Sequence, residues 1–484
     1  MYAPNNDSAK DNNGLTGSIV NAAKFAFTSP FQIHFRDGEI FSSEQVLRLV
    51  PKKRMIAFGT WQNKPVVAKL FFNPRHAKTN MEKDLAGVRL LQYKQILTPN
   101  LLYQGISEDE QIYVLLFERI FDAHTLEEIW KNKKSEDSLQ PLMQSMMFEF
   151  AAKHRLGILQ HDLHLNNYLL TPTEIYMLDG EKIEFSDYLS KEICINNLAE
   201  FFSQFGVEME AYQEDLFCYY AMMRGWLLKQ SDIKQLSTLV QKWNVRRWER
   251  CKKKITEESS NFSLVNQSGV SGVIDRSHGY PNFINLIHNP DDIFNHPDAE
   301  IINESGEIKE IKLKIDNCDI VAKRYSQNFW QSLTQCFSHS KAFKIWQIAQ
   351  KLNFSGIKTA KPIAFFEKRS FGFCIKSYYF TEAVAGVSLT EFLANKAQSN
   401  HVAKHVADLF KDLPKLGFKN DSLTLQTVMI NHQEQPVITN LESITILSSQ
   451  LKSQLSYFLR IYCSFNLRSR ILKLTSRARF NENH

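Results

Sequence analysis

The stretch 157–182, "GILQHDLHLNNYLLTPTEIYMLDGEK", carries three oxygen-bearing side chains at spacings that suit one kind of chemistry. Asn167 follows Asp162 by five positions, and Asp179 follows it by seventeen. The short apolar runs "NYLL" and "IYML" separate them. This pattern predicts that the first acid lies on a loop and the last at the end of a strand. Phosphoryl transfer from a magnesium nucleotide uses an aspartate at the acceptor hydroxyl, with an amide and a second aspartate as oxygen ligands of Mg²⁺. We therefore expect Asp162 to act as the base and Asn167 and Asp179 to hold the metal.

The same chemistry needs a fixed cation for the nucleotide phosphates, and Lys69 is the candidate. It lies near the end of the run "KPVVAKLFF", whose apolar and β-branched residues predict a strand. In phosphoryl-transfer sites a strand lysine holds the α- and β-phosphates, and an acid on the following helix pins that lysine. Residues 78–95 predict such a helix, because their apolar side chains recur around one side.

The size and composition are typical of a globular protein with more than one domain. The chain has 484 residues, which predicts two or three domains, and 43% of them are hydrophobic and 23% charged. There is no apolar run of about 18 residues that would predict a membrane-spanning helix. Residues 1–30 start with a polar stretch and are expected to form a disordered tail rather than a secretory signal.

Cysteine usage and charge narrow the compartment and the partners. The seven cysteines include no Cys-x-x-Cys pair, so neither zinc nor a disulfide framework is indicated, and a reducing compartment fits. The net charge is +6, with basic clusters at 51–54, 246–254 and 468–479. These clusters are either solvated faces or contacts for an anionic partner such as a phosphate or a membrane surface. No nucleic-acid partner is expected, because no basic motif with interleaved aromatic residues is present.

The order of the expected elements predicts an α+β fold with two lobes. Residues 44–72 predict strands, split by the turns "PKK" and "QNK". Residues 140–156 predict a helix that leads into the acid-bearing loop, and helices dominate from 196 to 254. Strands followed by helices are typical of an α+β arrangement.

An internal repeat organises the chain. The segment 261–299 is rich in Ser, Asn, Gly and Pro and predicts a linker, after which the order of motifs recurs. "DIVAKRY" matches "VVAKLFF", "GIKTAKPIAFFE" matches "QILTPNLLYQG", and "PVITNLESI" matches "IYMLDGEKI". Lys323 thereby matches Lys69. The expected domains are a first copy at 31–260 and a second at 300–484.

Together these motifs resemble the protein-kinase-like superfamily. "VVAK" is similar to its strand-three motif, "QHDLHLNNYLL" to its catalytic loop, and "MLDGEK" to its metal-aspartate motif. Over residues 45–240 the chain more closely resembles bacterial lipopolysaccharide core kinases, which phosphorylate Kdo or heptose, through "VLRLVPKKR", "VVAKLFF" and "RHAKTNMEKDLAGVRLLQYKQILTPNLL". In the second copy, "VAKRYSQNFWQSL" is similar to the same family's amino-terminal lobe. The resemblance implies two tandem bilobal protein-kinase-like domains, each with an antiparallel-sheet N-lobe and a mostly helical C-lobe.

The resemblance also implies roles for further residues of the first copy. The acid that pins the phosphate lysine is Asp84, with Glu82 as the alternative. Glu118 falls at the hinge between the lobes and is either an adenine-site residue or a surface acid. Gln160 stands where the family has a histidine that braces the catalytic loop, and we expect its amide to do the same. The nucleotide-binding hairpin lacks its usual glycines apart from Gly59, so the cations of "PKKR" are candidates to replace backbone amides.

The second copy keeps the lysine and loses the other site residues. Neutral amides and hydroxyls do not compensate the charge of Mg²⁺ as carboxylates do. We therefore expect a pseudokinase. The positions concerned are Ser422 or Asp421 for the base, Thr427 or Gln426 for the metal amide, and Asn440 for the metal aspartate.

The expected function is ATP- and Mg²⁺-dependent phosphorylation of a sugar hydroxyl, on heptose or Kdo, in the lipopolysaccharide inner core. The implied partner is a lipid-linked core oligosaccharide. The implied location is the cytoplasm, with weak peripheral contact to the inner membrane through the basic clusters. The alternatives are a nucleotide-binding regulatory or scaffold pseudokinase, or a kinase for another small alcohol or a protein. The lack of an Ala-Pro-Glu motif after Asp179 disfavours a protein substrate.

Overall fold

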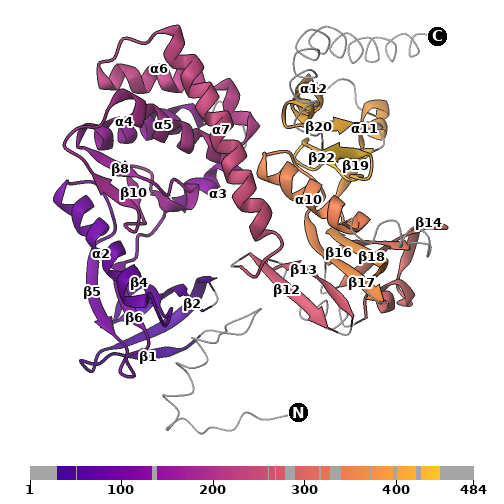
Figure 1. Cartoon of the computed structure of the whole chain (residues 1–484), viewed down its shortest axis with the longest axis horizontal. Helices are drawn as coiled ribbons and strands as arrows, with labels where there is room; N and C mark the ends of the chain where they lie inside the picture. The colour runs from indigo at the N-terminus through magenta and orange to yellow at the C-terminus, as the bar shows by residue number, and fades with distance from the viewer. Residues whose placement is uncertain are drawn as a thin grey trace. The chain divides into compact units, whose positions relative to one another are not determined.

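The computed structural model divides the chain into two compact units, whose boundary in the sequence lies between Arg247 and Trp248 (Figure 1). Both units mix helices with antiparallel sheets. Most of the expected tail, the loop 421–426 and the basic cluster 468–479 lie outside the described residues. The described residues are 30–50, 52–132, 139–259, 261–267, 269–277, 289–315, 318–326, 339–370, 373–395, 400–420 and 427–446.

The first unit begins with a six-stranded antiparallel sheet, and its strands β2, β3 and β4 cover the region 44–72 in which strands were predicted. Its strand order is β1-β2-β3-β4-β6-β5, so that β4 lies in the interior. The strands are β1 (Gln32–His34), β2 (Ile40–Val50), β3 (Arg54–Trp61), β4 (Lys64–Phe71), β5 (Leu101–Ile106) and β6 (Tyr113–Glu118).

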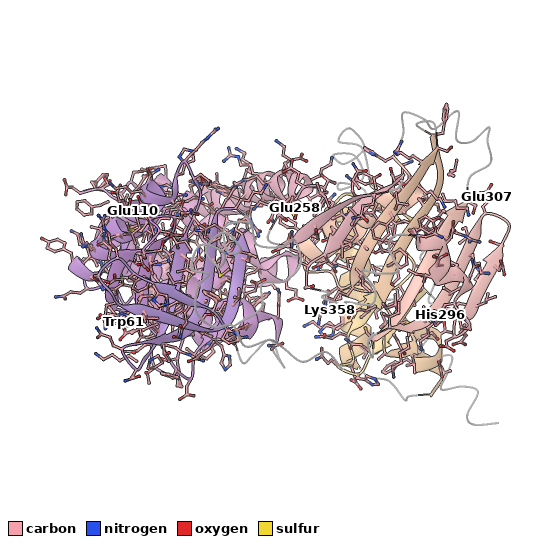
Figure 2. The ribbon with its side chains drawn as sticks, turned by 90° about the horizontal axis from the view of Figure 1, so that it is seen from below. Trp61, Glu110, Glu258, His296, Glu307 and Lys358 are labelled. Carbon is pink, nitrogen blue, oxygen red and sulfur yellow. The ribbon has the colours of Figure 1, made fainter. Side chains whose placement is uncertain are left out.

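The sheet curls until its two edge strands meet at one end. Phe35, just after β1, forms a bridge with Ser107, just after β5. Aromatic rings fill the inside of the curl: Tyr103 stacks on Phe35 with 4.8 Å between ring centroids, and Trp61, labelled in Figure 2, packs on Tyr103 at 5.3 Å. The curl fixes the strand that carries Lys69 within a closed framework.

Alternating side chains give the sheet two apolar faces. One face, which includes Ala68 and Leu70, packs in a core with Phe31 and Phe35, which flank β1, and with Phe41 of β2. The other face, which includes Phe71 and Leu115, packs against helix α2 (Ala77–Tyr93). Lys69 is directly opposite Leu115 in the ladder, and opposed residues of an antiparallel pair share a face. Lys69 therefore lies on the side of the sheet that α2 covers.

Helices make up most of the rest of the first unit, around a core rich in Met and Phe side chains. Helix α3 starts with a capping box in which Thr125 and Glu128 satisfy each other's backbone amides. The helices are α3 (Leu126–Lys131), α4 (Gln140–Arg155), η2 (Leu165–Asn167), α5 (Lys191–Phe202), η3 (Ser203–Phe205), η4 (Val207–Ala211), α6 (Gln213–Arg224) and α7 (Gln230–Lys254). The last residues of α7, from Trp248 on, belong to the second unit.

Two small antiparallel sheets hold the acid-bearing loops between these helices. In one, β8 pairs with β11; in the other, β9 lies between β10 and β7. The loop with Asp162 therefore runs from β8 to β9, and the turn with Asp179 runs from β10 to β11. The strands are β7 (His124–Thr125), β8 (Ile158–Gln160), β9 (Tyr168–Leu170), β10 (Ile175–Met177) and β11 (Ile183–Phe185).

The second unit is built on a seven-stranded sheet of order β12-β13-β17-β18-β16-β15-β14. The expectation of a linker at 261–299 is wrong for its first part, because 262–275 form two strands that join this sheet through β17. The strands are β12 (Phe262–Gln267), β13 (Val270–Asp275), β14 (Glu300–Ser305), β15 (Ile308–Ile315), β16 (Cys318–Ser326), β17 (Pro362–Ser370) and β18 (Phe373–Glu382).

Helices and short strands complete the described part of this unit. Two small sheets, of order β19-β21-β22 and β20-β23, follow the large one. The remaining elements are η5 (Pro290–Asn295), α10 (Lys341–Phe354), β19 (Gly386–Ser388), α11 (Leu389–Asn395), α12 (Asn400–Lys415), β20 (Phe418–Asn420), β21 (Val428–Asn431), β22 (Pro436–Ile438) and β23 (Ile444–Ile446).

The topology of the first unit recurs in the second, which supports the internal repeat. The order β2-β3-β4-β6-β5 corresponds to β14-β15-β16-β18-β17, with a helix, α2 or α10, after the third strand of each. The register agrees as well. Lys69 lies between Ile56 and Leu115 on the neighbouring strands, and Lys323 lies between Glu310 and Tyr379.

No helix within the described residues is long and apolar enough to cross a membrane.

Candidate active site

The carboxylate of Asp84 joins three parts of the first unit. Its Oδ2 accepts a hydrogen bond from Lys69 Nζ at 2.7 Å, and its Oδ1 accepts one from the amide of Gly180 at 2.9 Å. Lys69 also donates to the carbonyl oxygen of Leu178 at 2.8 Å. Strand β4, helix α2 and the turn after β10 therefore meet at one buried acid.

The structure resolves which acid of α2 pairs with the lysine. The side chain of Asp84 is 1% exposed, whereas that of Glu82 is 54% exposed and lies 3.9 Å from Lys78. Residues two apart lie on nearly opposite sides of a helix. Only Asp84 therefore faces the sheet.

Burial and charge together set the protonation of this cluster. Burial by itself would lower the pKa of Lys69, but Asp84 and Asp179 outweigh it and hold that pKa above its usual value. Burial would likewise raise the pKa of Asp179, yet Lys69, the amide of Glu181 and Arg54 hold it below its usual value. Both groups are therefore charged at neutral pH, as binding of a metal and a phosphate requires.

Two glycines allow α2 to approach the turn that holds Asp179. A Cβ on Gly87 would lie 1.9 Å from the carbonyl oxygen of Gly180, and a Cβ on Gly180 would lie 2.3 Å from that of Asp84. The opposing atoms belong to the backbone, so neither position accommodates a side chain. This close approach keeps Asp84 within hydrogen-bonding distance of the Gly180 amide, and the sequence analysis did not recognise it.

Gln160 braces the loop that carries Asp162, and the expectation of this role is confirmed. Its side chain is buried, with Oε1 accepting from the Tyr168 hydroxyl at 2.9 Å and Nε2 donating to the carbonyl oxygen of Asp162 at 3.3 Å. Asn197 from α5 donates to the carbonyl oxygen of Gln160 at 2.8 Å. The loop is thus fixed to both a strand and a helix.

Asn167 connects the loop of Asp162 to the turn of Asp179. Its Nδ2 donates to the carbonyl oxygen of Asp162 at 2.9 Å, and its own carbonyl oxygen accepts from the amide of Leu178 at 3.0 Å. Asp162, Asn167 and Asp179 are therefore brought together, as the spacing predicted. Because the amide nitrogen of Asn167 is bound to the loop, its Oδ1 is the side-chain atom that a metal would use.

Two basic side chains flank the carboxylate of Asp162. His164 Nε2 lies 3.6 Å from Oδ1, and Lys182 Nζ lies 3.9 Å from Oδ2. His161 instead pairs with Glu184 at 3.0 Å. The sequence analysis missed Lys182, although its place directly after "DGE" was the available signal.

The donor set fits a Mg²⁺ ion that is bound partly through substrate phosphates. No group of three or more His, Cys, Asp or Glu side chains in the described part of the chain is placed to hold a metal without help. Mg²⁺ commonly takes one or two protein carboxylates, with phosphate oxygens and water as its other ligands. Asp179 accepts the Glu181 amide through Oδ1 at 3.0 Å, which orients its carboxylate. Asp179 and the Oδ1 of Asn167 would hold the ion.

The side chain of Glu118 is bound to the chain itself. Its Oε1 accepts from the amide of Asn100 at 2.9 Å, and its own amide donates to the carbonyl oxygen of Asn100 at 2.9 Å. These bonds tie the end of β6 to the segment before β5. A role of Glu118 in binding the nucleotide base stays a prediction.

In the second unit, carboxylates surround the matching lysine. Lys323 Nζ lies 3.4 Å from Glu310 Oε2 and 3.4 Å from Glu442 Oε1. Glu442 also accepts from the Tyr325 hydroxyl at 2.8 Å and lies 3.4 Å from Lys341 on α10. The network neutralises Lys323 with two carboxylates, whereas Lys69 pairs with the helix acid Asp84 and donates to the carbonyl oxygen of Leu178.

Backbone hydrogen bonds fix the correspondence between the two sites. The hydrogen bond from the Leu178 amide to the carbonyl oxygen of Asn167 has a counterpart in the second unit. There the Thr439 amide donates to the carbonyl oxygen of Thr427 at 3.1 Å. The bond from the Glu181 amide to Asp179 Oδ1 recurs as one from the Glu442 amide to Asn440 Oδ1 at 3.1 Å. Thr427, rather than Gln426, therefore stands at the metal-amide position, and Asn440 at that of the metal aspartate. The chain from β20 to β21 is as long as that from β8 to β9, which assigns Ser422, rather than Asp421, to the position of Asp162 by count.

No protein-family model matches the chain, and no curated protein sequence matches it significantly.

We expect Gly87→Val to loosen the contact between α2 and the turn of Asp179. Overpacking costs about 1–3 kcal/mol, which corresponds to a fall in melting temperature of roughly 3–10 °C for a unit of this size. Hydrogen exchange at the Gly180 amide should become faster, because its bond to Asp84 opens. Ala86→Val, on the exposed side of the same helix, is the matched control for the β-branched residue. Equal melting temperatures and equal Gly180 protection in the two variants would contradict the close-approach account.

Proposed function

We propose that the first unit is an ATP-dependent kinase with a bilobal protein-kinase-like arrangement. The observation that carries the proposal is the bridging of Lys69 and the Gly180 amide by Asp84, which holds a charged lysine beside Asp179. A lysine pinned by a helix acid, next to a metal-binding aspartate, is the arrangement that phosphoryl transfer uses. The motifs of the first unit also follow one another in the order that kinases have, which supports the proposal further.

The chain's own groups have distinct parts in the reaction. Lys69 holds the α- and β-phosphates of ATP, and Asp162 orients the acceptor hydroxyl and takes up its proton. The acceptor oxygen forms a bond to the γ-phosphorus while the bond from that phosphorus to the β,γ-bridging oxygen breaks, and ADP leaves. Lys182 lies 3.9 Å from Asp162 and is a cation available to negative charge that develops on the transferring group. Asn167 and Asp179 would hold Mg²⁺, which would neutralise part of the phosphate charge.

The acceptor in this proposal is a sugar hydroxyl, on heptose or Kdo, of the lipopolysaccharide inner core. Its support is the resemblance of residues 45–240 to core kinases. The exposure of Asp162, 23%, leaves the base open to an acceptor from solvent. A lipid-linked acceptor would place the protein at the cytoplasmic face of the inner membrane, with weak contact through basic side chains such as those of 246–254.

The second unit in this proposal is a pseudokinase that serves as a scaffold. Its lysine is neutralised by Glu310 and Glu442, and Thr427 and Asn440 stand where the first unit has a metal amide and a metal carboxylate. Because two carboxylates already compensate Lys323, that lysine is a poor partner for a triphosphate. The unit then contributes packing and surface rather than catalysis.

A direct experiment offers the purified chain γ-labelled ATP and Mg²⁺ together with heptose, Kdo, core oligosaccharide, a small alcohol or a generic protein. We expect label in the core oligosaccharide or its sugars. Label only in the protein or the alcohol would overturn the acceptor, and ATP binding without label in any acceptor would favour the nucleotide-binding regulator.

Asp162→Asn and Asp179→Asn should fail in different ways. The first removes the base, which contributes about 10²–10⁴ in rate, and should leave ATP affinity within about twofold. The second removes one charged ligand and should weaken Mg²⁺-dependent ATP binding about tenfold. Asp187→Asn, an exposed neighbour, is the isosteric control. Transfer rate and ATP affinity are measured for all three, and an Asp162→Asn variant with full activity would remove that residue from the reaction.

Lys69→Gln and Lys323→Gln test the assignment of the two units. Lys69→Gln should lose ATP affinity by about tenfold or more, because a charge-assisted phosphate contact is lost. Lys323→Gln should leave transfer and ATP affinity unchanged and lower only the melting temperature, because Glu310 and Glu442 lose their shared cation. Matched losses of activity in the two variants would mean that the second unit is also a required nucleotide site.

A further inference from the structure

Three cations lie on one face of the first sheet. Arg48 on β2 is opposite Ile56 on β3, and Ile56 is opposite Lys69 on β4. Opposed residues share a face, so Arg48 and Lys69 lie on the same face two strands apart, about 10 Å between Cα atoms. Arg54 precedes Ile56 by two residues and shares this face as well. The face is the one that α2 and the turn of Asp179 cover.

The hairpin that carries these arginines has no glycine in its turn. The connection between β2 and β3, residues 51–53, reads "PKK". Gly59 lies within β3, where it is paired with Ser43 and Val66. A Cβ on Gly59 would lie 2.1 Å from the carbonyl oxygen of Ser42. The glycine is therefore needed for the close packing of β3 against β2. The hairpin thus lacks the flexible glycines that let a backbone wrap phosphate, and its arginine side chains are the candidates for phosphate contacts.

Arg54 reaches the turn that holds Asp179. Its Nη1 lies 3.0 Å from Glu181 Oε2, in a pair whose side chains are 30% and 27% exposed. Glu181 in turn donates its amide to Asp179. Partly exposed ion pairs are worth about 1 kcal/mol or less, whereas arginine binds phosphate through two parallel hydrogen bonds. A phosphate is therefore able to replace Glu181 as the partner of Arg54.

Arg48 is exposed and has no ion pair of its own among the described residues. Partial desolvation and Arg54 lower its pKa, while Asp162, Asp179 and Glu127 act in the opposite direction. Arg48 is thus a cation on the same sheet face as Lys69 with no side-chain carboxylate bound to it. This placement suits a ligand that brings more negative charge than one metal ion compensates.

We infer that Arg48 and Arg54 bind the β- and γ-phosphates of the nucleoside triphosphate, and that Glu181 holds Arg54 until the phosphate displaces it. The inference rests on the proposed function, since it assigns the phosphate contacts of the same site. A triphosphate carries about four negative charges and one Mg²⁺ compensates about two of them, while Lys69 is shared with Asp84. The hairpin arginines supply further positive charge in place of glycine amides.

The test measures dissociation constants for ATP, ADP, AMP and tripolyphosphate, each with Mg²⁺, on the full chain. Arg48→Gln and Arg54→Gln should weaken ATP and tripolyphosphate about tenfold and AMP less than about twofold. Lys64→Gln removes the same charge from an exposed position at the start of β4, on the opposite face of the sheet, and should change none of the constants. The AMP arm separates contacts to the outer phosphates from general loss of the site.

Glu181→Gln tests whether a phosphate displaces Glu181 from Arg54 or whether the Arg54–Glu181 ion pair is only structural. If Glu181 competes with phosphate, this variant should bind ATP about threefold more tightly, since Arg54 is released beforehand. Weaker ATP binding by Glu181→Gln, or an unchanged ratio of ATP to AMP affinity in Arg48→Gln and Arg54→Gln, would overturn the inference while the proposed function stands. A wild-type chain that binds none of the nucleotides would overturn the proposed function itself.

Discussion

The site of the first unit depends on one buried carboxylate, that of Asp84. A buried acid is costly unless a charge and hydrogen bonds compensate it, and Asp84 has both, from Lys69 at 2.7 Å and the Gly180 amide at 2.9 Å. Because the two partners belong to a strand and to a distant turn, satisfying the acid also positions the turn. This turn places Asp179 beside Lys69. It also positions Asn167, whose carbonyl oxygen accepts a hydrogen bond from the amide of Leu178.

The second unit keeps the framework of the first but has different acids around its lysine. Its ladders keep the register of Lys323, and the bond between Thr439 and Thr427 repeats the one between Leu178 and Asn167. The helix after the lysine offers no acid in the described residues to take the part of Asp84. Glu442, which matches Glu181, forms an ion pair with Lys323 instead. Matching positions of the two units thus carry different charges, and the lysine pairs with a helix acid in the first unit and with two other carboxylates in the second.

Much of this arrangement follows from the sequence, and the rest depends on contacts that sequence spacing does not reveal. The strands over 44–72, the helix α2, the repeat and the grouping of Asp162, Asn167 and Asp179 were predicted, because local patterns and motif order determine them. The pairing of Asp84 rather than Glu82 required knowing which side of α2 meets the sheet. The pair of Arg54 and Glu181 joins residues far apart in the chain, and the strands β12 and β13 were missed because Ser, Asn and Gly also occur at the edge of a sheet.

The most direct measurement of the central claim is calorimetric titration of the full chain with ATP, in the presence and in the absence of Mg²⁺. The proposal that only the first unit binds nucleotide predicts a single binding site per chain, with affinity that depends on Mg²⁺. Two sites per chain, no binding, or equal affinity without the metal would contradict the account.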